Sequence, residues 1–447
     1  MYKEGFFPKN ERIRLIMKLN YKRTILVGFA FFLISAFWQA YDAIVPLILT
    51  NKFEMGQTWS GLIMSLDNIF AVILLPIFGS LSDKTKTRFG KRTPYIVCGC
   101  ILASVFISML GIVSSLVGFI ILLLACLLSM AVFRSPAVAL MPDVTLKPLR
   151  SKGNAIINLM GTAGGMLVLG LSILFKTSEA GKTDFVNYLF VVGYVMLISL
   201  IVFLLTVKEP LWSREAEREN EKLDREAAAA APAEEKAEAS ETRKLTRSEL
   251  ISLILILASV ALWYIGYNAV TSKYSVYATE VLKVPYDKTL LIAQGAAIIS
   301  YIPVGIVASK LGRKKTILAG VAMLTTAFFA ASFIKEGSPN IVMYVLFSLA
   351  GIGWATINVN SFPMVVELAK NGDVGKYTGY YYTASMAAQI VTPIFSGFLV
   401  DTVGWWIFFP YAAFFAALAF VTMSFVKHGD AKPEAQGALE SLGGADD

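Results

Sequence analysis

Long apolar segments alternate with short polar ones along most of the chain. Twelve of the apolar segments have about 20 residues or more, which is the length that a helix needs to cross ~30 Å of hydrocarbon. Only helices and closed barrels satisfy their backbone hydrogen bonds in lipid. The pattern therefore predicts an all-α membrane protein with twelve spans at 24–50, 58–81, 95–113, 116–140, 153–175, 186–206, 249–272, 289–309, 316–334, 340–362, 377–400 and 405–426.

Composition supports a protein that resides in a lipid bilayer. The 447 residues have a mean hydropathy of +0.63, and 16% are charged, against about 25% in typical soluble domains. The cysteines Cys98, Cys100 and Cys126 all lie in apolar segments, so we interpret them as small packing residues. The single histidine, His428, follows the last span. We expect no metal site, no cofactor and no catalysis by imidazole within the membrane.

The lysines and arginines lie mainly in alternate loops. The two terminal segments and five of the connections hold 32 of the 40 cations, whereas the opposite loops hold 7 and Arg134 lies within a span. Because positive loops stay in the cytoplasm, both termini are expected there. The protein itself is expected in the cell (plasma or inner) membrane. The basic N-terminal flank is similar to that of a signal peptide. However, the apolar segment that follows is too long and contains Asp42, so we expect a retained helix.

The charged segment 207–248 divides the chain into two sets of six spans. It has no evident apolar face, and we interpret it as a solvated cytoplasmic linker. The predicted domains are an N-terminal bundle (1–206), the linker, a C-terminal bundle (249–427) and a flexible tail (428–447).

The two halves resemble each other at equivalent positions. AYDAIV at 40–45 parallels GYNAVT at 266–271, and GSLSDKTKTRFGKR at 79–92 parallels GIVASKLGRKK at 305–315. Repeats of six spans are typical of secondary transporters, whose binding site lies near the midplane between the repeats.

Two motifs carry a family resemblance. The G-x-x-x-D pattern at Gly79–Asp83, followed by basic residues, resembles the loop between the second and third helices of the major facilitator superfamily. The longer form SDKTKTRFGKRTP at 82–94 is similar to that of glycoside–pentoside–hexuronide:cation symporters and sucrose-type transporters. FRSPAVALMPDV at 133–144 resembles the fourth-helix motif of the sucrose-type branch.

This resemblance implies two six-helix bundles around a central cavity, lined mainly by helices 1, 4, 7 and 10. It also implies cation-driven uptake of a sugar or glycoside by alternating access. One departure concerns the cation, since AVILLPIFG at 71–79 lacks the two acids that sodium-coupled relatives carry in helix 2. We therefore expect a proton rather than Na⁺.

Ionisable residues inside spans are costly, at roughly 2.5–3.5 kcal/mol each on insertion scales, so they face a cavity or a partner. Asp42 in helix 1 and Asp67 in helix 2 are the candidates for cation coupling. Arg134 in helix 4 lies nearer the cytoplasmic edge, so the count along the helices does not establish a direct pair with Asp42, and water or substrate could bridge the two. The alternatives are a hydrogen bond from Asp42 to a neighbouring helix and an Arg134 that reaches the inner surface.

Neutral polar and aromatic side chains are the other candidates for substrate binding, because sugars combine hydroxyls with C–H faces that stack on rings. Packing between helices is the alternative for each. With Arg134, the candidate set is Trp38, Gln39, Tyr267, Asn268, Trp354, Asn358 and Gln389.

The basic loop supplies candidates for gating. Asp83 at the C-terminal end of helix 2 is unfavourable with that helix dipole, so it should meet Arg88, another nearby cation or a neighbouring helix N-terminus. Such a contact would join the bundles on the inside, and the alternative is a solvated aspartate among lysines. The gating set is Asp83, Arg88, Gly90, Lys91 and Arg92.

Other functions remain as alternatives. An exporter of drugs or metabolites would share the fold, and a sugar sensor that does not transport would use the linker to bind a partner. A membrane enzyme is disfavoured because no catalytic dyad or phosphate-binding loop is evident. We expect a monomer that binds lipid, a small solute and H⁺ or Na⁺, and no nucleic acid.

Overall fold

The computed structural model describes residues 19–230, 245–369 and 374–430. Within these residues, twelve helices are long and apolar enough to cross a membrane, and the elements are helices without strands. The predicted all-α fold with twelve spans is confirmed.

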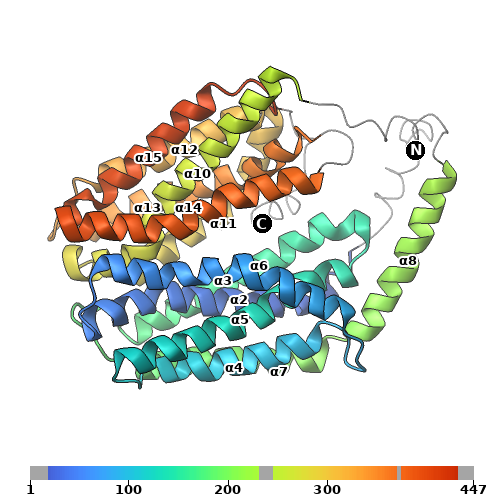
Figure 1. Ribbon diagram of the computed structural model, residues 1–447, viewed down its shortest axis with the longest axis horizontal. Coiled ribbons are helices and arrows are strands. Elements are labelled where there is room, and N and C mark those ends of the chain that lie inside the picture. The colour runs from blue at the N-terminus through green and yellow to red at the C-terminus, as the bar shows by residue number, and fades with distance from the viewer. Residues whose placement is uncertain (1–18, 231–244, 370–373, 431–447) are drawn as a thin grey trace.

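The first six membrane helices form one bundle, the lower one in Figure 1. Within it, α2 packs against α6 and α7, while α4 lies between α5 and α7. The helices are α2 (Tyr21–Leu47), α3 (Gln57–Lys84), α4 (Thr93–Leu110), α5 (Leu116–Val144), α6 (Arg150–Leu174) and α7 (Val186–Thr206), with short π or 3₁₀ turns at Ile48–Lys52 and Lys147–Leu149.

The last six form a second bundle beside the first. Here α13 packs against α11 and α12, and α10 packs against α14 and α15. The helices are α10 (Arg247–Val276), α11 (Tyr286–Leu311), α12 (Arg313–Ala331), α13 (Asn340–Val366), α14 (Val374–Val403) and α15 (Phe408–Ser424), with short turns at Tyr277–Leu282 and Trp405–Ile407.

Local sequence signals fix several helix starts. Thr246 and Glu249 form a capping box in which each side chain binds the other residue's backbone N–H at the start of α10, so two unpaired donors are satisfied. Ser115 caps α5, and Asn20 caps α2. Residues of this type are the usual N-caps because their side-chain oxygens accept these N–H groups.

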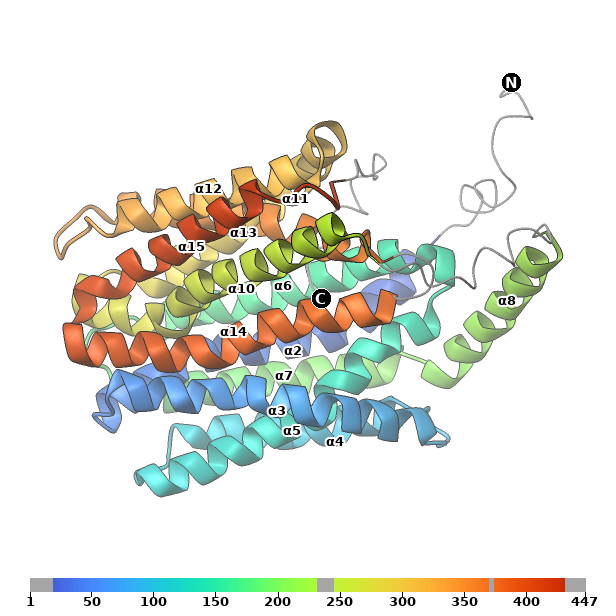
Figure 2. The same ribbon diagram turned by 45° about the horizontal axis from the view of Figure 1, so that its top comes forward.

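Three pairs of helices make the most extensive contacts between the bundles. They are α3 with α14, α6 with α11, and α2 with α10. Figures 1 and 2 show the bundles lying side by side, with α8 beyond one end. We name this the α8 end and the opposite one the far end, where α3 begins and α14 finishes.

The helix α8 (Glu209–Ala230) occupies the first part of the segment between the bundles. Trp212, Ala216 and Asn220, four residues apart, are buried, and α8 packs against α5. Asn220 also accepts a hydrogen bond from the backbone N–H of Lys147 at 2.9 Å. The interpretation of this part as solvated and without an apolar face was wrong, because a stripe of only three side chains escapes notice among so many charges. Residues 231–244 of the predicted linker lie outside the described part.

Two cysteine predictions hold and one does not. Cys100 and Cys126 are buried between helices, whereas Cys98 is exposed on α4, so packing within the protein does not explain it. In the predicted tail, only residues 428–430 belong to the described part of the chain. There His428 lies 2.9 Å from the hydroxyl of Ser248.

Candidate functional site

Asp42 lies inside the protein and still has an open surface. It is on α2, which packs against helices of both bundles. Its side chain is exposed, although Tyr41 beside it is buried. The charges of Asp67 on α3 and Arg134 on α5 both act on Asp42. Because charged neighbours from α3 and α5 lie close to it, this side of Asp42 faces the protein rather than lipid.

Asp67 and Arg134 complete this charged group. Both are half-buried, and the charge of Arg134 acts on both acids. The Oδ1 atom of Asp67 accepts hydrogen bonds from the backbone and side chain of Asn68, at 2.6 and 2.7 Å. The structure therefore brings the three ionisable residues together as one cation with two acids.

Trp38 and Gln39 connect this group to its surroundings. The guanidinium carbon of Arg134 lies 5.7 Å from the centre of the Trp38 ring, a distance typical of a cation–π contact. Gln39 accepts a hydrogen bond from Gln294 of α11. This amide pair joins the two bundles next to the charged group.

An aromatic cluster forms the corresponding surface in the second bundle. The rings of Tyr267 and Trp354 stack with centres 3.6 Å apart and planes 2° apart. Tyr264 meets Trp354 edge to face at 5.2 Å. Because Tyr267 covers one face of Trp354, a ligand can stack only on the remaining faces of this pair.

The other predicted binding residues are half-buried. Asn268 on α10 donates its side-chain amide to the carbonyl of Tyr264 at 2.9 Å. Asn358 on α13 and Gln389 on α14 are also half-buried. These three amides are thus accessible enough to bind a polar ligand. Among the described contacts, none of them joins the group formed by Asp42, Asp67 and Arg134.

Sequence reasoning did not single out Tyr382 of α14. Its phenol lies close enough to Arg134 to act on it electrostatically, so the group reaches across the bundle interface. A signal was present in the run Tyr380–Tyr382, because three consecutive tyrosines place a phenol on more than one face of a helix.

The basic loop is held within the first bundle by Arg92. This side chain is 4% exposed and contacts Asp83, Ser82 and Asp143, the last at 2.8 Å. The partner of Asp83 is therefore a nearby cation, Arg92, rather than Arg88. Arg88 is instead exposed and lies over the Phe89 ring, 4.6 Å from its centre.

Glu209 of α8 fastens the same loop to the end of the bundle. Its buried carboxylate accepts the backbone N–H groups of Lys91, Arg92 and Thr93 at 2.7–2.8 Å, and the Thr93 hydroxyl at 2.6 Å. It thereby caps α4, as carboxylates do at helix N-termini. Gly90 has a φ of +111°, and a Cβ there would lie 2.2 Å from Glu209, so only glycine fits.

The second bundle repeats this arrangement. Arg313 at the start of α12 pairs with Glu367 at 2.8 Å, as Arg92 pairs with Asp143. Asp430, which follows α15, accepts the backbone N–H of Lys314 at 2.8 Å, as Glu209 caps α4. The weak sequence repeat thus corresponds to equivalent contacts.

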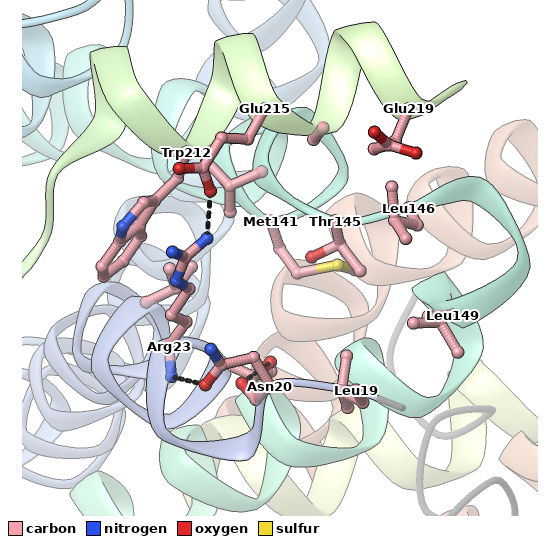
Figure 3. A pocket seen from close by; sticks show the side chains of 14 residues that line it. Leu19, Asn20, Arg23, Met141, Thr145, Leu146, Leu149, Trp212, Glu215 and Glu219 are labelled. Atoms are coloured by element: carbon pink, nitrogen blue, oxygen red, sulfur yellow. Dashed lines mark hydrogen bonds and ion pairs between the residues drawn. The ribbon is translucent and has the colours of Figure 1, made fainter. Parts of the chain in front are cut away.

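A pocket of about 200 Å³ lies between α8 and the ends of α2 and α5. Figure 3 shows Arg23 beside Trp212, with an ion pair to Glu215 and a backbone hydrogen bond to Asn20. The guanidinium of Arg23 is 5.2 Å from the Trp212 ring centre. This pocket is at the α8 end, away from the Asp42 group.

The two-bundle fold and the family that it matches define a membrane transporter. A family model described as MFS/sugar transport protein matches residues 26–375. The chain therefore belongs to this family of the major facilitator superfamily, which confirms the resemblance and shows that the protein is a transporter and not an enzyme.

Individual relatives agree with this assignment. An uncharacterized MFS-type transporter of Methanocaldococcus jannaschii is 26% identical over 387 residues, covering 85% of this chain and 88% of that protein. The chloramphenicol resistance protein CraA of Acinetobacter baumannii is 26% identical over 189 residues, 40% of this chain and 44% of that protein. The inward-open xylose transporter XylE of E. coli has a TM-score of 0.67 at 14% identity, covering 94% and 99% of the two chains, and so shares the fold.

Proposed function

We propose that this transporter takes up a neutral sugar or glycoside together with a proton, by alternating access. The observation that supports it most is the exposed side chain of Asp42 beside Asp67 and Arg134, on a helix that packs against both bundles. The family description, MFS/sugar transport protein, supports a sugar as the solute.

The charges of this group suggest how coupling works. One arginine balances one carboxylate, and a second bare carboxylate in a poorly solvated site is unfavourable. A proton on Asp42 or Asp67 therefore neutralises the site. A substrate whose hydroxyls engage Arg134 would change that balance, so that binding of the sugar and of the proton favour each other.

The polar candidate residues suit a sugar better than an apolar drug. Amides of Gln39, Asn358 and Gln389 can both donate and accept hydrogen bonds, and the Tyr267–Trp354 stack offers aromatic surface for C–H faces. We assign a proton rather than Na⁺, because the stretch 71–79 of α3 has no acid.

The distribution of cations supports an orientation with the α8 end in the cytoplasm. The connections 82–94, 141–152 and 310–315 lie at this end, and they belong to the alternate segments that hold 32 of the 40 lysines and arginines, which translocate poorly. Both termini would then be cytoplasmic, in the plasma or inner membrane. We propose that the protein acts there as a monomer, because each chain has its own two bundles.

Proteoliposomes test the proposal directly. The wild-type protein should concentrate one member of a panel of radiolabelled sugars when a pH gradient is imposed, and should only equilibrate it without a gradient. Asp42→Asn should abolish accumulation and keep part of the sugar exchange, because the site can then no longer release a proton. Asp184→Asn, the same change in a carboxylate outside the site, should leave both unchanged.

Accumulation of sugar by Asp42→Asn would show that another group couples transport. A wild-type protein that moves none of the sugars would contradict the proposal as a whole.

A second candidate, export of an organic compound, is favoured by the partial similarity to CraA. In inside-out vesicles an exporter would load chloramphenicol or a similar compound in response to an acidic lumen, whereas a sugar symporter would not. A sensor that does not transport would be inactive in both assays.

A further inference from the structure

The far ends of the two bundles are joined by a cluster of hydrogen bonds that the transport site does not use. We propose that Asp401 and Lys273 are the outer gate of this transporter. They hold α14 and α10 of one bundle to the first turn of α3 in the other when the cavity is closed to the outside. This inference goes beyond the proposed solute and coupling ion, and takes only the orientation from the proposed function.

Asp401 caps a helix that belongs to the other bundle. One carboxylate oxygen accepts the backbone N–H of Gln57 at 2.8 Å, and the other accepts the N–H and the hydroxyl of Thr58 at 2.7 and 2.6 Å. The first turn of a helix has N–H groups without partners. The N-cap of α3 is Gly56, which has no side chain to accept them. The second bundle therefore supplies the cap that the sequence of α3 lacks.

Lys273 binds the same turn from α10. It is 1% exposed, and its ammonium group donates to the carbonyl of Gln57 at 2.9 Å. Asp401 acts on this ammonium electrostatically. A buried ammonium group is stable only when it is paired. Separation of the far ends would take Lys273 away from Gln57 and expose its ammonium group to water.

The backbones of α3 and α14 approach closely at the same place. A Cβ on Gly397 would lie 2.2 Å from the carbonyl oxygen of Gln57, and a Cβ on Gly61 would lie 1.9 Å from that of Pro393. Larger residues at these positions therefore fit only when the helices move apart. The glycines allow the contact in which Asp401 reaches the helix terminus.

A second group of contacts lies at the same end. Glu280 lies in the turn Tyr277–Leu282 that follows α10. It accepts hydrogen bonds from Asn51 at 2.8 Å and from the backbone of Gly181 at 2.9 Å, both in the first bundle. Since these bonds remain in an Asp401 variant, a single substitution should shift the gate equilibrium without abolishing closure.

Distances between spin labels measure that equilibrium. Ser114 and Glu336 are exposed residues in far-end loops of different bundles, so both can be replaced by labelled cysteines once the three native cysteines are changed to alanine. Asp401→Asn should raise the ratio of outward-open to outward-closed molecules about tenfold, which corresponds to about 1.4 kcal/mol. In the measured distribution of distances between the two labels, the fraction of long distances should grow.

Asp184→Asn is the matched control. Asp184 also caps a helix, by accepting the N–H of Val186 at 2.9 Å, but within one bundle. This variant should keep the distance distribution of the parent. An equal shift in the control, or none in Asp401→Asn, would overturn the proposal.

Gly397→Ala provides a second, independent variant and decides the matter should Asp401→Asn fail to fold. Its methyl group clashes only in the closed contact, so it should also increase the long distances, and a distribution like that of the parent would contradict the gate. Because the measurement needs no substrate, its outcome is separate from whether the solute is a sugar.

Discussion

At the scale of single residues, Arg92 shows how a cation in a basic loop becomes structural. Burial by itself lowers the pKa of Arg92, but its hydrogen bonds and charge contacts with Asp143 and Asp83 outweigh burial and raise the pKa above its ordinary value. When the pKa of a basic group is raised in the folded protein, its full contribution to folding stability is present at any pH below its pKa in the unfolded chain. That contribution is lost only as the pH rises through the folded-state pKa. The contribution of Arg92 to the free energy of unfolding should therefore not change between pH 7 and 9.

The carboxylate of Glu209 gives a sharper prediction at this scale. Glu209→Ala removes four hydrogen bonds and leaves three backbone N–H groups of the loop without their partner. It should lower the free energy of unfolding by about 2 kcal/mol, measured by denaturant unfolding in detergent micelles. Glu217→Ala, at an exposed position of α8, should change it by less than about 0.5 kcal/mol. Equal effects of the two variants would contradict the capping role.

At the scale of elements, α8 is part of the first bundle rather than a tether. Its buried stripe contacts α5, Arg23 of α2 stacks on Trp212, and Lys147 pairs with Asp224 at 2.7 Å. Most of its other side chains are exposed charges. A few apolar contacts therefore hold a helix whose composition suggests full solvation.

This arrangement predicts how α8 detaches. Ala216→Glu places a charge against α5, where a buried unpaired charge is strongly unfavourable. It should make α8 at least tenfold more sensitive to trypsin at Arg218 and Lys222, measured by limited proteolysis of the purified protein. Arg214→Ala, an exposed change on the same helix, should leave the cleavage rate at those sites unchanged. A resistant Ala216→Glu protein would show that the packing contributes little.

At the scale of the whole molecule, the two bundles are related through their contacts more clearly than through their residues. Glu209 and Asp430 each follow the sixth helix of a half and cap its third helix. Arg92 and Arg313 each pair with an acid at the C-terminal end of the fourth helix. The repeat preserves charge and position where it does not preserve residue type, since Asp143 corresponds to Glu367.

The proposed orientation is a prediction at this scale. Single cysteines at Ser114 or Glu336 in the far-end loops should react with a thiol reagent that cannot cross membranes, in intact cells. A cysteine at Lys86, in the basic loop, should react only after the cells are opened. The opposite pattern would place the α8 end outside and contradict the proposed topology.

The sequence by itself determined the number of spans, the two-bundle fold and the family. Apolar segments of bilayer length can form little else than helices, and the motifs at 79–94 and 133–144 are local. It also indicated that Asp42, Asp67 and Arg134 matter, because charges within apolar segments are conspicuous whatever the fold.

Only the tertiary structure decided which of these residues meet. Spacing along one helix does not give the rotation of its neighbours, so neither the contact of Arg134 with Trp38 nor the approach of Tyr382 could be derived. The packing of α8 and the capping of α3 by Asp401 depend on segments far apart in the chain. Such contacts arise from how helices pack against one another, and hydrophobicity along the sequence does not encode that geometry.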